Sequence, residues 1–365
     1  MTGVQTCALP ISLGGCGINR ADADTGSVQS EAASDHKTTK NSNAEYTSEV
    51  FAMDTYMTLT AYGENAKEAV EAGIAEIQRL DALLSTGDAN SEVAQINQNG
   101  GGTLFEDTDY LVKRALAIYQ STQGAFDISI YPVMQLWGFT TGDFAVPSKE
   151  DLAAKLALVN AGRISLMEDN GVSSITLPEG MEIDLGGIAK GYTSGRVMEV
   201  MKRYGIESAV INLGGNAHVL GSKPDGSAWK VGIQDPNDTN GYLGGVSVRD
   251  KAIITSGGYE RYFVDEATGV KYHHIIDPKT GYSANNGLIS VTIVSADSTL
   301  ADGLSTSLFV LGTEDAIAYC EEHCAEDGFD AIMEDEDGKL YITDGIMDDF
   351  INMNNTANIQ EIKTK

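Results

Sequence analysis

The chain has 365 residues, 42% of them hydrophobic, and its 53 acidic against 24 basic residues give a formal net charge of -29 at pH 7. This hydrophobic content is sufficient for a core, and a folded part of roughly 310 residues is compatible with a single domain of two lobes. The negative charge argues against nucleic acids and anionic membrane surfaces as binding partners, because their phosphates would repel the protein. For the same reason, an anionic ligand would need a cation or backbone N–H groups at its site.

The first 44 residues are predicted to lie outside the folded domain. Residues 1–12, MTGVQTCALPIS, resemble translated sequencing adapter and are excluded from the fold prediction. Within residues 1–20, Leu13-Gly14-Gly15-Cys16 resembles a bacterial lipobox, whose cysteine becomes the lipidated first residue of the mature protein. Residues 21–44 are rich in Ser, Thr, Asp, Ala and Asn, which predicts a flexible tether. We therefore expect an extracytoplasmic protein that is anchored to the bacterial cell membrane by lipid.

Residues 45–350 are expected to form the domain, and their first half alternates strands with amphipathic helices. Strands are predicted within residues 46–62, and the apolar spacing that follows predicts a helix. A second helix is expected to have Thr108 as its N-cap, and a third starts with Ser148 and Asp151 as a capping box. The alternating segments RISLME and SSITLP predict a hairpin. The three helices are expected over residues 66–84, 110–122 and 149–159.

The second half of the domain contains a glycine-rich helix start and several strands. MEIDLGGIAKGY reads as a strand, a turn and a helix, an order that points backbone N–H groups at a phosphate. Residues 229–277 are predicted to supply successive strands of a second sheet region, and residues 329–346 a closing hairpin. The polar tail, residues 351–365, is expected to be frayed.

The segment of residues 272–311 carries the clearest chemistry. Asp277-Pro278-Lys279-Thr280-Gly281 predicts a tight turn, and Ser298 is expected to cap a helix that Gly312 ends. On that helix Asp302 and Thr306 are four residues apart, so they share one face. A carboxylate and a hydroxyl offer the hard oxygen ligands that Mg²⁺ prefers when it also binds phosphate. The alternative is a solvated polar face without a metal.

These segments together resemble the ApbE family of flavin transferases, which move FMN from FAD onto proteins. The likeness extends over roughly residues 50–311 and rests on GAFDISIYPVMQLWGF, IDLGGIAKGY, HHIIDPKTGY and TLADGLSTSLFVLG in family order. It implies an α+β fold with mixed or antiparallel sheets and packed helices, FAD as substrate and Mg²⁺ as cofactor. It also implies that the partners are flavin-carrying subunits of membrane redox complexes.

The resemblance also implies the site residues. It adds the Gly187 carbonyl to Asp302 and Thr306 as a third metal ligand. The family often has an aromatic residue where Gly87 stands and an acid where Asn216 stands, so these two positions are left out of the site. The residues that it assigns to FAD are Met53, Ala125, Phe126, Asp127, Asp184, Lys190 and His274.

Two histidines, His273 and His274, lie side by side on an expected strand and would point to opposite faces. The family spacing H-x-x-D-P selects His274, which we predict to be the catalytic base. In the implied reaction a Thr or Ser hydroxyl of the acceptor protein attacks the FMN phosphorus and AMP departs. Two alternatives stay open. The protein could be an FAD pyrophosphatase that yields FMN and AMP, or a flavin-binding lipoprotein without turnover.

Overall fold

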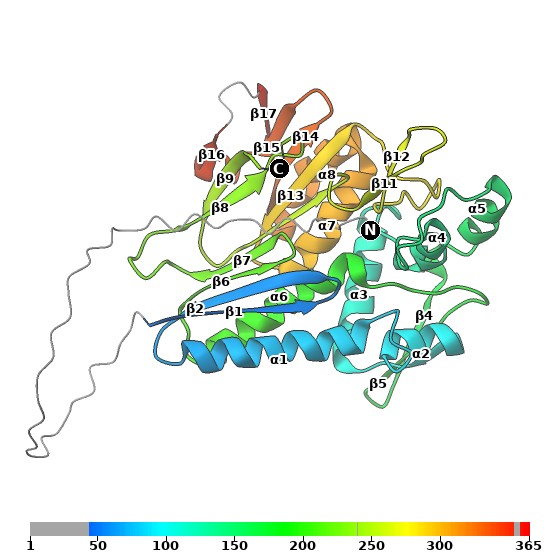
Figure 1. The fold of residues 1–365 in the computed structure, drawn as a ribbon, viewed down its shortest axis with the longest axis horizontal. Coiled ribbons are helices and arrows are strands. Elements are labelled where there is room, and N and C mark those ends of the chain that lie inside the picture. The colour runs from blue at the N-terminus through cyan, green and yellow to red at the C-terminus, as the bar shows by residue number, and fades with distance from the viewer. Residues whose placement is uncertain (1–43, 239, 354–357) are drawn as a thin grey trace, which may run out of the picture.

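The computed structural model describes residues 44–238, 240–353 and 358–365 (Figure 1). The predictions for the lipobox and for residues 1–43 of the expected anchor and tether lie outside these ranges. The described residues combine helices with antiparallel and mixed sheets, which confirms the predicted α+β class. No helix within them is long and apolar enough to cross a lipid bilayer.

A nine-stranded sheet forms the centre of the molecule, in the order β1-β2-β6-β7-β10-β13-β14-β15-β17. Neighbouring strands are antiparallel except for β15 and β17, which are parallel. The strand bounds are β1 Glu45–Ala52, β2 Thr55–Tyr62, β6 Ser208–Leu213, β7 Asn216–Gly221, β10 Ala252–Gly257, β13 Leu288–Ser295, β14 Phe329–Asp335, β15 Lys339–Thr343 and β17 Asn358–Ile362.

Helices cover one face of this sheet, and a small sheet covers part of the other (Figure 1). Alternate residues of β2, such as Met57 and Leu59, pack with α1 and α6 in one apolar cluster. On the opposite face Val210 and Val294 pack against β8 and β9. The helices are α1 Ala66–Leu84, α6 Gly186–Arg203, α7 Ser298–Leu311 and α8 Thr313–Asp327, and the small sheet comprises β8 Trp229–Gln234, β9 Tyr242–Val248 and β16 Phe350–Asn352.

The remaining elements form a second part that adjoins the helical layer. Its apolar contacts include a cluster around Trp137, whose indole N–H donates to the Gly281 carbonyl at 2.8 Å. The elements are α2 Glu92–Asn99, β3 Gly101–Thr103, α3 Glu106–Ser121, α4 Tyr131–Trp137, α5 Lys149–Leu156, β4 Ser165–Asp169, β5 Val172–Thr176, β11 Tyr262–Val264 and β12 Lys271–His273, with short 3₁₀ turns at Ile128–Ile130, Ala161–Arg163 and Met347–Asp349.

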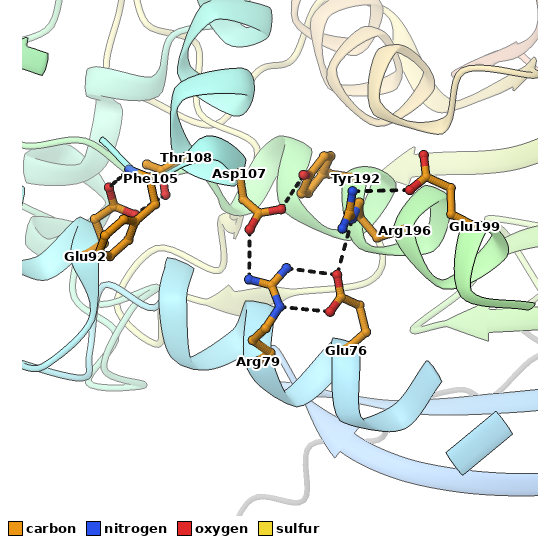
Figure 2. Close-up of polar contacts among 9 residues, drawn as sticks. All are labelled: Glu76, Arg79, Glu92, Phe105, Asp107, Thr108, Tyr192, Arg196 and Glu199. Carbon is orange, nitrogen blue, oxygen red and sulfur yellow. Dashed lines mark hydrogen bonds and ion pairs between the residues drawn. The ribbon is translucent and has the colours of Figure 1, made fainter. Parts of the chain in front are cut away.

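Helix α3 does not start where the sequence predicted. It begins at Glu106, so Thr108 lies inside its first turn and is not its N-cap. The Glu92 carboxylate, which belongs to α2, accepts from the Phe105 N–H and from the Thr108 hydroxyl (Figure 2). A side chain distant in sequence therefore satisfies groups at this helix end, which local capping patterns cannot reveal. Helix α5 has the predicted Ser148 cap but ends at Leu156.

Three further predictions are corrected. The N-cap of α7 is Asp297, whose carboxylate accepts from the Leu300 N–H at 3.0 Å, because Ser298 has already entered the helix. Residues 229–277 do not form one second sheet region, because β10 belongs to the central sheet and β11 pairs with β12 in a separate two-stranded sheet. The tail is not frayed throughout, since β17 pairs with β15 and buries Ile362. The pairing of a polar strand with a distant edge is a tertiary effect that its own sequence does not show.

Helix α6 is held against α1 and α3 by a network of charged side chains (Figure 2). Arg79 of α1 donates to Glu76 and to Asp107 of α3, at 2.8 Å in each case. Asp107 also accepts from the Tyr192 hydroxyl, and Glu76 accepts from Arg196 at 3.3 Å. Since Tyr192 and Arg196 belong to α6, these contacts fix the orientation of that helix about its own axis.

Candidate functional site

The other side of α6 gathers most of the residues that the sequence predicted. Lys190 lies close enough to Asp184, Glu260, His274 and Asp302 to act electrostatically on each of them. Asp184 and Lys190 lie at the two ends of one short segment. Glu260 comes from the loop after β10, His274 from the segment after β12, and Asp302 from α7. The fold therefore brings four separate parts of the chain to the start of α6.

Two of the predicted metal ligands lie on α7 and the third at the start of α6, and the two helices cross beside Asp302. Asp302 is buried, and its Oδ2 accepts from the Gly191 N–H at 2.8 Å. In an α-helix that N–H is the regular partner of the Gly187 carbonyl, so the carboxylate and this carbonyl adjoin the same donor. Thr306 lies one helical turn beyond Asp302, with its hydroxyl 3.3 Å from that of Ser256. The three predicted oxygen donors are thus compatible with one cation.

Glycine is required at this crossing. A Cβ atom on Gly191 would lie 2.2 Å from the Ser298 carbonyl oxygen and 2.6 Å from the Asp302 Cβ. No side chain fits in that space, because both contacts are far shorter than van der Waals separations. Gly191 therefore lets the Asp302 carboxylate reach the backbone of α6. Gly191 was not among the residues predicted for the site.

The carboxyl groups of the site are held in an environment that disfavours their charge. Burial raises the pKa of Asp302 and of Asp184, although Lys190 opposes the shift in both cases. The packing around Glu260 also raises its pKa to about 7, and the charge of Asp302 adds to that effect, although part of the residue is exposed to solvent. A bound cation would stabilise the charged forms.

A cation here would depend on few protein charges. In the described ranges no three His, Cys, Asp or Glu side chains gather as a metal cluster. Asp302 would be the charged ligand, and the Gly187 carbonyl and the Thr306 hydroxyl would be neutral ones. This set fits Mg²⁺, which commonly binds through one or two carboxylates and completes its shell with water and substrate phosphates.

The predicted flavin residues of the 125–127 segment serve two different purposes. Phe126 is buried, and its ring lies 3.0 Å from the position of a Cβ on Gly187, so it packs against the start of α6. The Asp127 carboxylate accepts from the Ser129 N–H at 2.8 Å and from the Ala161 N–H at 3.1 Å. Both of its oxygens are thereby occupied in holding the local backbone. Asp127 thus holds the segment that carries its buried neighbours Ala125 and Phe126.

Met53 lies in the tight turn between β1 and β2 with a φ angle of 50°. Its backbone N–H donates to Asp81 of α1 at 3.0 Å, and its sulfur is 3.8 Å from the Thr193 hydroxyl of α6. The turn therefore places Met53 against the same helix that carries Lys190. Gly87, by contrast, is exposed and has only the Ser85 hydroxyl near the position of a Cβ.

The two histidines face different surroundings. The buried His273 has its Nε2 3.0 Å from the Ala284 carbonyl and its ring edge against Phe309, which indicates a structural role. The Nδ1 of His274 is 3.2 Å from the Arg261 carbonyl. Because a carbonyl only accepts, Nδ1 carries the proton and Nε2 presents a lone pair. Burial and the charge of Arg261 lower the pKa of His274 to about 3, so it is neutral at pH 7.

Three residues of the site were missed from the sequence. Asn216, which follows the Gly214-Gly215 turn, donates to Asp302 Oδ1 at 3.3 Å. Glu260 and Arg261 come from the loop after β10. The charges of Lys190 and Asp302 act on the Glu260 carboxyl group, and the charge of Arg261 acts on Asp184. The double glycine before Asn216 was a signal for a close approach. Nothing in the local pattern distinguishes Glu260 from an ordinary loop carboxylate.

The fold and the site define a class of protein: an α+β enzyme with an acidic centre at a helix start, whose oxygen donors fit a cation. The ApbE family model matches residues 53–333, and the chain belongs to this family. A protein of Klebsiella pneumoniae (strain 342) named FAD:protein FMN transferase is 38% identical over 66% of this chain and 75% of its own length. A protein of Treponema pallidum (strain Nichols) with the same name is 33% identical over 83% of this chain and 88% of its own.

Solved structures agree with this assignment. The ApbE protein of Thermotoga maritima matches with a TM-score of 0.76 and 32% identity, over 83% of this chain and 98% of that one. The flavin transferase ApbE of Vibrio cholerae matches with a TM-score of 0.71 and 29% identity, over 82% of this chain and 97% of that one. The predicted family and α+β fold are therefore confirmed, and the chain is a transferase of this family.

Proposed function

We propose that the protein transfers FMN from FAD to a Thr or Ser hydroxyl of an acceptor protein and requires Mg²⁺. The observation that carries this proposal is the crossing of α6 and α7, where the buried Asp302 carboxylate accepts from the Gly191 N–H and lies within electrostatic reach of Lys190. Mg²⁺ held there would neutralise the charge of the FAD pyrophosphate. The names of the relatives support FAD as the donor.

In the proposed reaction the acceptor oxygen forms a bond to the FMN phosphorus. The bond from that phosphorus to the bridging oxygen breaks, and AMP leaves with that oxygen. The hydroxyl proton passes to Nε2 of His274, whose lone pair is free because Nδ1 donates to the Arg261 carbonyl. Lys190 adds positive charge beside the phosphates, and Phe126 packs where it can support the flavin.

The test is to incubate the protein with FAD, Mg²⁺ and a flavin-carrying redox subunit, and to weigh the subunit by mass spectrometry. A gain equal to FMN is the expected result. Release of free FMN and AMP without a mass gain would make the protein a pyrophosphatase. Unchanged FAD would make it a binding protein without turnover.

We also propose that Cys16 carries a lipid that anchors the protein outside the cytoplasm. The lipobox-like sequence Leu13-Gly14-Gly15-Cys16 and the polar stretch that follows it support this proposal. When the protein is expressed with a signal sequence ahead of Leu13, Cys16→Ser should release it from the membrane fraction and leave transfer unchanged. Equal solubility of both versions would contradict the anchor.

A further inference from the structure

Two aromatic rings lie together on the surface at the end of the β1–β2 hairpin. Phe51 and Tyr56 are direct partners across the two strands, and their ring centroids are 5.0 Å apart in an edge-to-face arrangement. They are 59% and 60% exposed. Single exposed apolar residues are common, whereas a preassembled pair of rings is typical of a surface that a partner covers.

The position of this pair connects it to the site. Phe51 and Tyr56 point away from α1 and α6, because their neighbours Ala52 and Met57 are the residues buried against those helices. The Tyr56 carbonyl accepts from the Gly214 N–H at 3.2 Å. Two residues further along, Asn216 donates to Asp302. The backbone of Tyr56 is therefore bonded to the turn that precedes Asn216, which contacts the proposed cation ligand.

The turns and loops between the rings and the site are held together by contacts of their own. A Cβ atom on Gly215 would lie 3.8 Å from Glu260 Oε1, so the Gly214–Gly215 turn adjoins the loop that carries Glu260. The other end of the hairpin turn is fixed by the bond from the Met53 N–H to Asp81. The rings therefore lie at the end of the hairpin whose turn is held beside the loops of the site.

The charge beside the rings indicates the chemistry of the partner. Glu49 lies two residues before Phe51, is exposed and shares its face of β1. Exposed aromatic faces next to a carboxylate favour Lys and Arg side chains, which gain both cation–π and ionic attraction. In a chain of net charge -29, a basic partner is also attracted at long range.

We propose that Phe51, Tyr56 and Glu49 form the docking surface for the acceptor polypeptide, and that they bind a Lys or Arg side chain near the hydroxyl that receives FMN. The inference rests on the proposed transferase function and deepens it. It assigns these three residues to recognition of the protein substrate, and it leaves the binding of FAD to the opposite side of the hairpin turn.

The test compares Phe51→Ser/Tyr56→Ser with the wild-type protein, using a flavin-carrying redox subunit as the acceptor. The double variant should raise the KM for the acceptor by about tenfold or more and leave kcat and the Kd for FAD unchanged. Glu49→Lys should give a smaller increase in KM that shrinks when salt is added, because salt screens the new repulsion. Met167→Ser is the matched control, since Met167 is an apolar residue that is 66% exposed on β4.

Each other outcome overturns the proposal in a recognisable way. An unchanged acceptor KM in the double variant would show that the acceptor docks elsewhere, while the transferase function would stand. A weaker affinity for FAD would assign the rings to the donor, and a change of oligomeric state by sedimentation would assign them to a second copy. If the wild-type protein transfers FMN to no acceptor, the proposed function and the docking surface fail together.

Discussion

The carboxyl groups on the two sides of α6 have pKa values that are shifted in opposite directions. On the side toward α1 and α3, the hydrogen bond from Arg79 holds the pKa of Glu76 below its ordinary value. Burial opposes the same effect at Asp107, yet bonds from Arg79 and Tyr192 lower its pKa as well. On the side toward α7, burial raises the pKa of Asp302 and of Asp184.

The difference teaches how one helix can serve structure and function. Carboxylates that have arginine partners stabilise the fold in their charged form without a bound cation. Among the described residues, Asp302 accepts from one backbone N–H and one amide, with Lys190 nearby, so its charge becomes favourable when a cation binds. We therefore expect substitutions on the two sides to separate metal dependence from stability.

The largest effect is expected at Asp302. Asp302→Ala removes the only full negative charge among the proposed ligands, so transfer should be abolished at ordinary Mg²⁺ concentrations. The measurement is the transfer rate as a function of Mg²⁺ concentration. If the variant kept the wild-type metal response, the cation would have to be bound elsewhere.

His274→Ala should come next. The loss of the Nε2 lone pair removes the proposed proton acceptor, so transfer should slow by ~10²–10⁴ while the Kd for FAD changes only a few-fold. Single-turnover kinetics with FAD in excess would separate the two quantities. Full retention of rate would move the role of base to a nearby carboxylate, for which Glu260 is the candidate.

Thr306→Ala should have a milder effect that more Mg²⁺ reverses, because water can replace a neutral hydroxyl ligand. Leu304→Ala on the same helix is the control, since Leu304 is fully buried and points into the core. Its loss should cost ~2–5 kcal/mol of stability and leave the metal dependence unchanged. Melting temperatures and Mg²⁺ titrations of both variants would test this contrast. A transfer rate of Thr306→Ala that extra Mg²⁺ does not restore would contradict the role of Thr306 as a ligand.

A several-fold effect of pH on metal affinity is expected. Raised pKa values mean that the site carboxyl groups take up protons at higher pH than free ones, and Glu260 does so at about 7. Protons compete with the cation, so the Mg²⁺ concentration for half-maximal rate should rise as the pH falls through about 7. Glu260→Gln should flatten this dependence. A Mg²⁺ requirement that stays constant across this range would exclude such competition.

The smallest effect is expected on the other side of the helix. Glu76→Gln should cost about 1 kcal/mol or less, because Arg79 is partly exposed to solvent. The pKa of Glu76 is lowered in the folded protein, so this stability is present above its unfolded pKa and is lost as the pH falls through the folded one. Thermal unfolding of both proteins at neutral and acidic pH would show it, and the Mg²⁺ response should stay as in the wild type.

The sequence was sufficient for some features because local rules control them. Apolar periodicity gave α1 its observed bounds, and the pattern Asp277 to Gly281 gave a turn in which the Gly281 N–H donates to the Asp277 carbonyl at 2.8 Å. The spacing of Asp302 and Thr306 placed both on one turn of α7. Motifs that occur together also brought Gly187, Lys190 and His274 into one region.

Features that depend on tertiary contact were missed. The cap of α3 comes from Glu92, thirteen residues before Phe105. Strand β17 is fixed by β15 and not by its own polar sequence. Glu260 belongs to the site because the Gly214–Gly215 turn packs beside its loop. In each case the cause is a neighbour distant along the chain, which residue patterns alone do not identify.

The most direct test of the account is calorimetric titration of Mg²⁺ into the FAD-loaded protein, for the wild type, Asp302→Asn and Glu76→Gln. Both substitutions remove one carboxylate charge, but on opposite sides of α6. We predict saturable binding in the wild type and in Glu76→Gln, and no detectable binding in Asp302→Asn. Equal Mg²⁺ binding by Asp302→Asn and the wild type would contradict the assignment of the cation to the crossing of α6 and α7.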